Sequence, residues 1–285
     1  MLYMGGRCKM PVITISRQLG SLGTEIAKLL CKNFHCKYLD KESLEEVFAG
    51  YGIPKENVER YDEKKPGIWD IFKTDKARYL HFLKSAIFEF ARKGNCIILG
   101  RGGQIVLKDL RGVLHVRVAA SMESRLQRIM KRFECDERHA ARIIEHNDSE
   151  RAGFHRFFFD CNWEEISLYD LVINTTSLSS ESAARLILDV ANGAELMARQ
   201  RETNLKLEDL SLEHRIKTEI IYKEKVSIQF LEVAADNGVV TLGGIAADND
   251  DIARCEQLAA AIDDVKSVRN EIYFKPVATT YGLHY

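Results

Sequence analysis

The sequence contains no run of about 18 apolar residues, which is the length that a helix needs to cross a membrane. It has only 4 prolines in 285 residues, too few for a long proline-rich linker. Its 7 cysteines include no C-x-x-C pair, and such an odd, scattered set indicates reduced thiols in the cytoplasm. No apolar segment follows the basic residues near the start, so we expect no secretory signal. Together these absences predict a cytoplasmic protein without stable membrane insertion.

An excess of either charge is also absent. The chain has 41 Lys and Arg against 42 Asp and Glu, and a protein that binds nucleic acid with its whole surface is usually far more basic. We therefore expect no nucleic-acid partner. The balance hides a division, because residues 205–285 carry 9 basic and 14 acidic side chains, a net charge of −5, and residues 1–204 carry +4. For a chain of this length, that change favours two domains with a boundary near residue 200.

Short apolar segments alternate with helical patterns over the first 200 residues. The β-branched and apolar runs predict buried strands at 11–16, 38–40, 96–99, 113–118 and 171–174. Apolar residues at helical spacing predict helices at 24–34, 41–48, 75–92 and 180–197, and the very charged stretch 122–156 is expected to be largely helical. Residues 51–74 are polar and broken by glycine and proline, which predicts an irregular or mobile segment. The alternation predicts an α/β domain whose parallel sheet is flanked by helices.

The pattern changes after residue 202. A helix is expected at 212–222, followed by strands at 228–234 and 239–242, a helix at 250–262 and a last strand at 268–274. Asp236-Asn237-Gly238 is a hairpin signal between the first two of these strands. This order, α-β-β-α-β, predicts a small α+β domain. We therefore divide the chain into a first domain at 1–197, a linker at 198–210 and a second domain at 211–285.

A glycine-containing loop, Gly20-Ser21-Leu22-Gly23-Thr24, joins the first buried strand to a helix. Such a loop can point backbone N–H groups at a phosphate, and the helix N-terminus adds a partial positive charge. A full P-loop reads G-x-x-x-x-G-K-[ST]. Here Gly23 stands where the lysine would be, Thr24 takes the hydroxyl position that helps to hold Mg²⁺, and Arg17 is the nearest remaining cation. From these residues alone, a glycine turn that packs a strand against a helix is an equally good interpretation.

Several charged residues are candidates for binding phosphate. Arg101 stands between glycines at the end of an apolar strand, where an arginine has few structural duties, so a functional role is favoured. Arg125 and Arg128 lie in a very basic helical segment, which could instead be a solvated helix face. Asp148 and Arg151 are three residues apart and could form only a surface ion pair. No histidines have the H-x-x-x-H spacing of metal ligands.

Six segments of the first 190 residues have a recognisable order and content. They are Ile13–Ala27, Tyr38–Glu42, Asn95–Gly103, Ala119–Arg128, Asp148–Arg151 and Tyr169–Thr175. Together they resemble the cytidylate kinase-like family of P-loop kinases, whose first segment reads I-S-R-x-x-G-S-G-G-R-E-I and also lacks the usual lysine. The resemblance implies a nucleoside monophosphate kinase that transfers a phosphoryl group from ATP, with Mg²⁺, to CMP, dCMP or a related acceptor nucleotide.

The resemblance also implies roles for single residues. The loop from Gly20 to Thr24 would hold the ATP phosphates, with Thr24 near Mg²⁺. Arg101 would hold the phosphate of the acceptor at the carboxyl edge of the sheet, where open α/β sheets bind ligands. Arg151 would reach a phosphate, and Asp148 would orient it or bind the sugar.

In the same comparison Arg125 and Arg128 would begin a lid over the nucleotides, because phosphoryl transfer requires charge near the moving phosphoryl oxygens. Leu22 and Thr24 depart from the family's G-S-G-G-R, since Leu22 adds a side chain and Thr24 removes a positive charge. The departures leave a second interpretation open. It is a nucleotide-binding regulatory module with little or no turnover, in which the C-terminal domain mediates association or sensing.

The second domain has its own resemblance. Asn237–Gly244, Ala259–Ile262, Val265–Val268 and Asn270–Ile272 are similar to the BON domain, which has no recognised catalytic residues. The resemblance implies a protein partner or a small ligand. With a net charge of −5, direct attraction to anionic lipid is not expected. A small packing module without a ligand is the alternative.

Overall fold

The computed structural model describes residues 10–50 and 73–276. The chain divides into two compact units, with the division between Asn204 and Leu205. Most of the predicted irregular segment at 51–74 lies outside the described residues; its last two residues open a helix. Each unit is described by itself below.

The first unit is built on a five-stranded parallel sheet with the strand order β2-β3-β1-β4-β5. Its strands are β1 (Ile13–Arg17), β2 (Lys37–Leu39), β3 (Cys96–Leu99), β4 (Leu114–Ala119) and β5 (Leu171–Asn174). In the register, Ile13 lies beside Ile97 on one side and Leu114 on the other. From β1 the chain first builds one side of the sheet, with β2 and β3, and then crosses to the other side, with β4 and β5. In open α/β sheets, ligands bind at such a crossover point, beyond the carboxyl ends of the strands. The predicted parallel α/β fold is confirmed.

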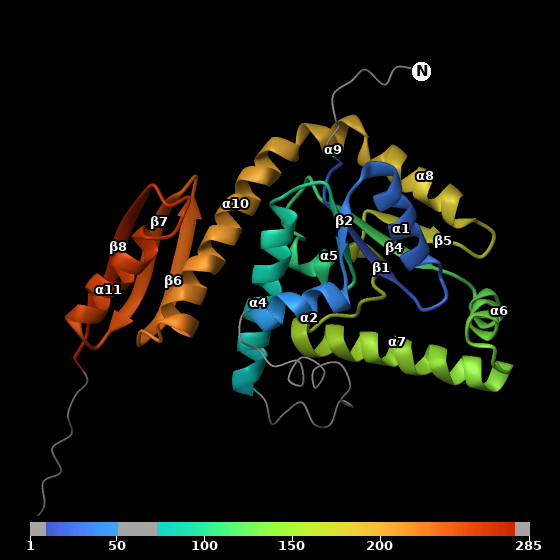
Figure 1. Cartoon of the computed structure of the whole chain (residues 1–285), viewed down its shortest axis with the longest axis horizontal. Helices are drawn as coiled ribbons and strands as arrows, with labels where there is room; N and C mark the ends of the chain where they lie inside the picture. The colour runs from blue at the N-terminus through green and yellow to red at the C-terminus, as the bar shows by residue number, and fades with distance from the viewer. Residues whose placement is uncertain (1–9, 51–72, 277–285) are drawn as a thin grey trace, which may run out of the picture. The chain divides into compact units, whose positions relative to one another are not determined.

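Helices cover both faces of this sheet (Figure 1). They are α1 (Gly23–Phe34), α2 (Lys41–Gly50), α4 (Lys73–Ala91), α5 (Gly103–Val106), α6 (Met122–Phe133), α7 (Glu137–Phe159), α8 (Ser180–Ala191) and α9 (Ala194–Ala198), with a 3₁₀ turn η2 at Ile166–Leu168. On one face, Ile26 of α1 and Ile187 of α8 pack with Ile13 and Val116 in the main core. On the other face, α4 and α5 contact β3 and β1.

The stretch 122–156, predicted to be largely helical, forms two helices. Glu134 ends α6 in a left-handed conformation, with φ of 51°, and Asp136 begins α7 by accepting a hydrogen bond from the His139 N–H at 2.7 Å. Ser121 caps α6 in the same way. Ser and Asp are favoured at these positions because they satisfy amides that the helix leaves unpaired. The break allows α6 and α7 to lie against each other beside the sheet's carboxyl edge.

The second unit has the predicted α-β-β-α-β order. It contains the part of α10 (Gln200–Lys217) that follows residue 204, a π-helical turn η3 (Thr218–Lys223), β6 (Ile228–Asp236), β7 (Val239–Ala246), α11 (Asn249–Ala260) and β8 (Ser267–Phe274). β6 and β7 are antiparallel and β7 and β8 are parallel. The predicted hairpin is present, with Asn237 and Gly238 at φ of 50° and 81°. Leu212, Val240 and Ile272 lie in its core.

The segment expected to be a linker, 198–210, is helical over most of its length. α10 begins at Gln200 and passes through the division at Asn204 without a break. No glycine or proline occurs between Gly193 and Gly238, and the intervening segment is rich in Glu, Lys, Leu and Arg, which favour helices. The boundaries of the two domains stay a prediction, taken up in the Discussion.

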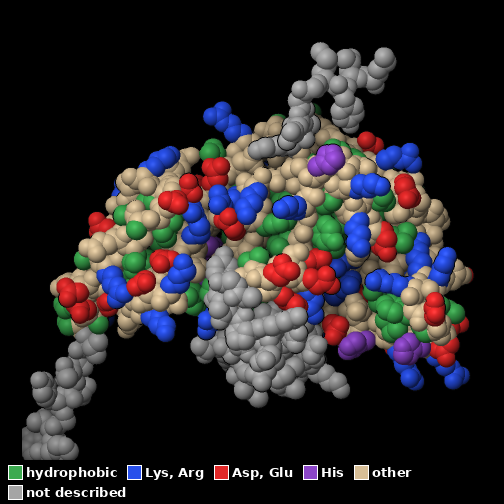
Figure 2. Space-filling view, viewed as in Figure 1, with side chains coloured by type: hydrophobic (Ala, Val, Ile, Leu, Met, Phe, Trp, Pro, Cys, Tyr) green, Lys and Arg blue, Asp and Glu red, His purple; other side chains and the backbone are tan. Residues whose placement is uncertain are grey.

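The charges on the surface are mixed. Figure 2 shows Lys and Arg side chains interspersed with Asp and Glu over the visible face. Among residues 10–50 and 73–276, no helix is both long enough and apolar enough to cross a membrane.

Candidate functional site

The predicted phosphate loop lies between the end of β1 and the start of α1. Gly20 has a φ of 77° and Leu22 a φ of 66°, so the chain turns twice through the left-handed region before Gly23 opens the helix. A leucine in this conformation costs roughly 1–2 kcal/mol. The surrounding structure therefore holds the loop in a shape that its sequence alone does not prefer.

Side-chain donors, all but one from outside the loop, hold the carbonyl groups of this segment. Arg151 donates to the Arg17 carbonyl, and Arg125 Nε donates to the Leu19 carbonyl at 2.7 Å. Three further bonds complete the set, from the Ser21 hydroxyl to Gln18 O (2.8 Å), from Arg128 to Gly20 O (3.0 Å) and from the Thr175 hydroxyl to Ser21 O (2.8 Å). Every carbonyl from residue 17 to residue 21 thus has a side-chain donor.

Most amide groups of the same loop, in contrast, have no hydrogen-bond partner among the described residues. Within the described part of the chain, the N–H groups of Leu19, Gly20, Leu22, Gly23 and Thr24 have no hydrogen-bond acceptor. The last two belong to the first turn of α1, where a helix always leaves its amides unpaired. Since the carbonyls are all held, the loop can offer only donors to a ligand, which is the arrangement that binds phosphate.

The Arg17 side chain packs closely against Gly23 and Gly100. A Cβ added to Gly23 would lie 2.4 Å from Arg17 Cβ, and one added to Gly100 would lie 2.5 Å from Arg17 Nη1. The guanidinium donates to the Leu99 carbonyl at 3.2 Å, and its buried Nε has no partner among the described residues. Burial, followed by the charges of Arg151 and Arg101, lowers the pKa of Arg17 to about 9.

Arg101 lies in a turn between β3 and α5. Gly100, Arg101 and Gly102 have φ of 80°, 55° and 69°, three left-handed residues in succession. The Arg101 guanidinium lies 5.6 Å from the centre of the Phe154 ring. Arginine is uncommon in this conformation, and such strained positions cluster at binding sites.

Arg17, Arg101 and Arg151 form what we call the arginine cluster. Each of the other two charges lowers the pKa of Arg17, and Arg101 contributes to lowering the pKa of Arg151 to about 10, although burial is the largest cause. Carboxylates such as Asp40 and Asp148 oppose these shifts only in part, and positive charges that repel one another favour an anion between them. The cluster adjoins the unpaired amides of the loop, so both features favour an anionic ligand at the same edge of the sheet.

Asp148 is paired with a different arginine from the one expected. Its Oδ2 accepts from Arg125 at 2.5 Å, across from α7 to α6, while Arg151 lies near enough for Asp148 to raise its pKa. Asp148 Oδ1 is buried without a partner among the described residues. Arg128 also donates to the Thr175 carbonyl at 2.6 Å. Arg125 and Arg128 therefore brace the loop through its backbone and are not a solvated helix face.

A buried polar network next to the cluster is not anticipated from the sequence. The Tyr169 hydroxyl lies 3.1 Å from the Ser16 hydroxyl and 3.5 Å from Gln104, and Gln104 lies 3.1 Å from the His155 ring. Burial is the main cause that lowers the pKa of His155 to about 4, so the ring is neutral at pH 7. Arg117, whose guanidinium lies 5.7 Å from the centre of the Tyr169 ring, is one signal in the sequence, because it stands with His115 in a buried strand.

Thr24 is the residue to which the sequence assigns the magnesium. It is half-buried in the first turn of α1, and its hydroxyl has no partner among the described residues. No group of three or more His, Cys, Asp or Glu able to hold a metal occurs in the described segments. Mg²⁺ does not need one, because it is usually bound by one or two protein groups, water and the substrate's phosphates. The loop fits ATP and Mg²⁺ on these grounds.

Two family models match the chain, in separate segments. Residues 12–177 match the "Cytidylate kinase-like family", and residues 208–276 match the "BON domain". The first match contains the loop, the arginine cluster and the polar network. The second contains the three strands of the small sheet.

Curated relatives agree with the first match. A cytidylate kinase of Methanococcus aeolicus is 25% identical over 189 residues, which is 62% of this chain and 94% of the relative. A cytidylate kinase of Pyrobaculum islandicum is 27% identical, over 63% of this chain and 92% of the relative. One from Sulfurisphaera tokodaii is 30% identical, over 62% and 92%.

A solved structure agrees with the fold. An uncharacterized protein from Eubacterium ventriosum superimposes with a TM-score of 0.51 and 21% identity, and the match covers 64% of this chain and 99% of that one. At this identity the likeness concerns the fold alone. The family match, which includes more than half of the chain, is the stronger finding. The chain thus belongs to the cytidylate kinase-like family of kinase-type phosphotransferases and carries a BON domain at residues 208–276.

Proposed function

We propose that this protein is a nucleoside monophosphate kinase that transfers a phosphoryl group from ATP to CMP, dCMP or a related monophosphate. The observation that carries the proposal is the arginine cluster beside a loop whose amides are unpaired. Two phosphorylated substrates that meet end to end would bring several negative charges to this edge of the sheet. Phosphoryl transfer depends mainly on positioning and on electrostatic stabilisation of those charges.

In this proposal the ATP phosphates bind the loop from Gly20 to Thr24, and Arg17 supplies the charge that the missing lysine would carry. The stem of Arg17 packs on Gly23, in the place that a side chain at residue 23 would need. A lysine at residue 23 and the observed Arg17 are therefore mutually exclusive. Arg17 approaches the site from the strand, whereas a P-loop lysine approaches it from the helix.

Arg101 holds the acceptor's phosphate in the proposal. The sheet fixes its backbone, and its side chain leaves a turn at the carboxyl end of β3, a different strand from the one that leads into the loop. A guanidinium can grip a phosphate with two parallel hydrogen bonds, which a lysine cannot reproduce. The two phosphate groups would then bind at neighbouring strand ends.

The remaining residues complete the site. Arg151 would stabilise the phosphoryl group between the two nucleotides, because it belongs to the arginine cluster and reaches the Arg17 carbonyl from α7. Arg125 and Arg128 would keep the loop in shape, and Asp148 would orient Arg125. Mg²⁺, when bound with ATP near Thr24, would neutralise phosphate charge.

A second candidate is a nucleotide-binding module with little or no turnover, in which the BON domain mediates association or sensing. The strained Leu22 favours it, because its side chain stands where the family has glycine. The use of Arg125 and Arg128 on loop carbonyls also favours it, because those guanidinium groups are then less available to a transferred phosphoryl group.

A coupled assay of ADP release, run over a panel of nucleoside monophosphates, separates the two candidates. If the protein is a kinase, we expect turnover with at least one acceptor. Titration calorimetry should then show that ATP and that acceptor each bind on their own. ATP binding without turnover on any acceptor would favour the second candidate. If ATP does not bind at all, both candidates fail.

The variant Arg101→Ala tests the assigned positions. We expect ATP affinity within twofold of wild type, whereas monophosphate affinity falls at least tenfold, about 1.4 kcal/mol. Arg101→Lys should recover only part of that loss. Arg185→Ala, which removes an exposed arginine on α8, is the matched control and should change neither affinity. Equal loss of both ligands in Arg101→Ala, with circular dichroism unchanged, would remove Arg101 from the acceptor site.

A further inference from the structure

A cavity of about 230 Å³ opens at the opposite edge of the same sheet, away from the phosphate loop. Its walls come from the segment between α5 and β4, from the amino ends of β4 and β5, and from the end of α9. The lining residues are Lys108, Leu110, Arg111, Val113, His115, Asp170 and Arg199. The amino end of a parallel sheet is not where this fold places its substrates, so the cavity is separate from the site described above.

The charge of the lining is unbalanced. Lys108, Arg111 and Arg199 are all exposed, and their side chains form no ion pair or hydrogen bond with the described residues. Asp170 is the one carboxylate of the lining, and its Oδ2 already accepts from the His115 N–H at 2.7 Å. The lining therefore holds three cations and one carboxylate that is partly satisfied.

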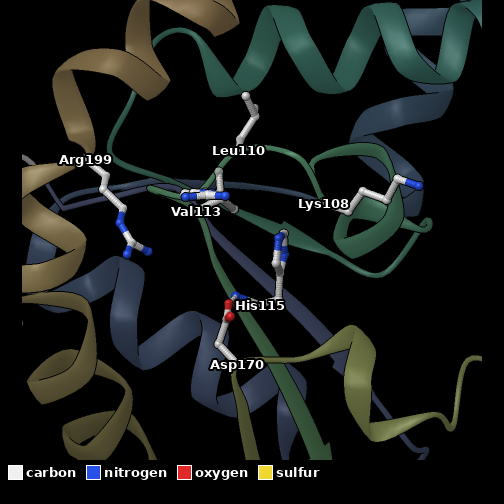
Figure 3. Close-up of a pocket in the computed structure, with 7 residues that line it drawn as sticks. Lys108, Leu110, Val113, His115, Asp170 and Arg199 are labelled. Carbon is white, nitrogen blue, oxygen red and sulfur yellow. Dashed lines mark hydrogen bonds between the residues drawn. The ribbon is translucent and has the colours of Figure 1, made fainter.

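His115 adds a buried donor to this lining. It is 7% exposed, and its Nδ1 lies 2.8 Å from the Thr14 hydroxyl. Its Nε2 has no hydrogen-bond partner among the described residues. In Figure 3 the His115 ring lies in the middle of the group, with Asp170 below it and Lys108 and Arg199 on opposite sides. Burial lowers the pKa of His115, although Asp170 and the Leu107 backbone oppose this, and a neutral ring that accepts from the Thr14 hydroxyl at Nδ1 carries its proton on Nε2.

We propose that this cavity binds a small, doubly charged oxyanion, of the phosphate type, between Arg111, Arg199 and His115. Guanidinium groups and an imidazole N–H are the donors that such an anion prefers. The volume is below the ≈300–1,000 Å³ typical of pockets that bury drug-sized ligands, so the cavity suits an anion much smaller than a nucleoside triphosphate. Inorganic phosphate and a small phosphorylated metabolite share this chemistry.

Hydrogen bonds connect the segment that lines the cavity to the start of α10. Gly112, between Arg111 and Val113, donates to the Thr203 hydroxyl at 3.0 Å, and its carbonyl accepts from the Gln200 side chain at 2.6 Å. Arg199 immediately precedes α10. An anion held by Arg111 and Arg199 would add a further link between the same two segments. We therefore expect occupancy to protect the first turn of α10.

The test uses the full chain and inorganic phosphate as the probe. The site-specific readout is the ring ¹⁵N resonance of His115, assigned by its loss in His115→Gln. We expect a saturable shift with phosphate, and none with chloride at the same ionic strength. The second readout is the rate of tryptic cleavage after Arg199 or Arg201, which phosphate should slow.

Arg111→Ala and Lys108→Ala are the test variants, and both replace exposed side chains, so folding is not at risk. We expect the apparent Kd at His115 to rise at least tenfold in Arg111→Ala and at least threefold in Lys108→Ala. Arg138→Ala and Lys32→Ala remove exposed cations of the same types from α7 and α1 and should stay within twofold of wild type. A matched loss in these controls, or no saturable shift in wild type, overturns the proposal.

Phosphate also suits the loop at the other edge of the sheet, so the two sites must be told apart. Gly20→Val, which places a side chain in the phosphate loop, should leave the His115 titration unchanged. If Gly20→Val abolishes the shift at His115, the ring is reporting the loop, and the cavity has no ligand of its own. A glycerol phosphate titration with the same pattern would extend the site to phosphorylated metabolites, and binding of inorganic phosphate alone would limit it to the free ion.

Discussion

At the scale of single residues, buried charge is placed where it costs the folded protein stability and favours a ligand. The arginine cluster sets three cations near one another at the edge of the sheet, and their repulsion and burial lower the pKa values of Arg17 and Arg151. Repulsion of this kind lowers the stability of the free protein and persists at binding sites, where an anionic ligand relieves it.

Replacing Arg17 by methionine tests whether its charge lowers the stability of the free protein and strengthens ligand binding. Methionine keeps most of the stem that packs on Gly23 and removes the charge. We expect a ligand-free melting temperature at least as high as that of wild type, and ATP affinity at least tenfold weaker. Differential scanning calorimetry and titration calorimetry measure the two effects. Arg138→Met, an exposed arginine of α7, should change neither. A less stable variant with normal ATP affinity would give Arg17 a purely structural role.

His155 predicts a specific sensitivity to acid. The pKa of the ring is lowered to about 4 in the folded protein from 6.5, so the unfolded chain binds a proton first as the pH falls. Stability from this residue is complete above pH 6.5 and is lost as the pH falls toward 4, by up to roughly 3 kcal/mol. Urea melts between pH 7 and pH 4 should show a shallower loss in His155→Gln than in wild type. His139→Gln, exposed on the same helix, should keep the wild-type slope.

At the scale of elements, a glycine determines how closely α7 approaches the turn that carries Arg101. Gly102 lies at the end of the left-handed turn that carries Arg101, and a Cβ added there would lie 2.3 Å from the Phe159 ring. The last turn of α7 is thus seated on the backbone of the turn. Gly153, in the middle of the same helix, has nothing within 4 Å of an added Cβ.

These two glycines form a matched pair for a stability experiment. Gly102→Ala should destabilise the protein by about 2 kcal/mol or more, because it adds overlap with Phe159 to a positive φ. Gly153→Ala should stabilise it by about 0.5–1 kcal/mol, because alanine is the better helix former and meets no neighbour. Urea denaturation measures both. If Gly102→Ala does not change the stability, α7 shifts to make room for the added methyl group, and the contact between Gly102 and Phe159 is not rigid.

The sequence predicted the elements well where short-range patterns decide them. The strands at 96–99 and 171–174 have the predicted bounds, because a β-branched run closed by turn residues leaves little choice. The stretch 122–156 is largely helical as predicted, but the position of the break at Glu134 to Asp136 was not, since a basic helical pattern continues on both sides. The change of charge predicted a linker at 198–210, but it carries no information about α10, which runs through most of that segment.

The site was predicted less completely, because part of it depends on contacts between distant segments. The motif placed the loop, Arg101 and Arg151 at one edge of the sheet, and the structure brings them together there. It could not show that Asp148 pairs with Arg125, because that contact depends on how α6 packs against α7. Nor could it show that Thr175, 154 positions after Ser21, holds the Ser21 carbonyl.

At the scale of the whole molecule, α10 belongs to both parts of the chain. Its first residues bond to Gly112 in the first unit, through Gln200 and Thr203. Its later residues serve the second unit, where Asp209 Oδ1 accepts from the Gly238 N–H at 3.3 Å. A boundary at 211, as predicted from the sequence, would cut this helix and remove Asp209 from the small domain.

The small domain should therefore depend on α10 for its stability. Leu212 and Ile216 lie in its core at 2% and 0% exposure, and Glu213 accepts a hydrogen bond from the Ala235 N–H at 3.0 Å. Deleting a buried leucine or isoleucine side chain typically costs about 2–5 kcal/mol. A domain of this size has only about 5–15 kcal/mol in total, so the loss of both would leave little.

We predict that fragment 200–285 unfolds in one cooperative transition, that 219–285 shows none, and that 211–285 melts at a lower temperature than 200–285. Thermal melts followed by circular dichroism, with amide spectra to confirm fixed tertiary structure, measure all three. Asp209→Asn in fragment 200–285 weakens the bond to Gly238 without shortening the helix. It should reproduce part of the difference between the two longer fragments, whereas Lys206→Gln, an exposed neighbour, should not. A cooperative melt of 219–285 at the temperature of 200–285 would show that the three strands and α11 are sufficient, and α10 would then be a connection between domains and no part of the second one.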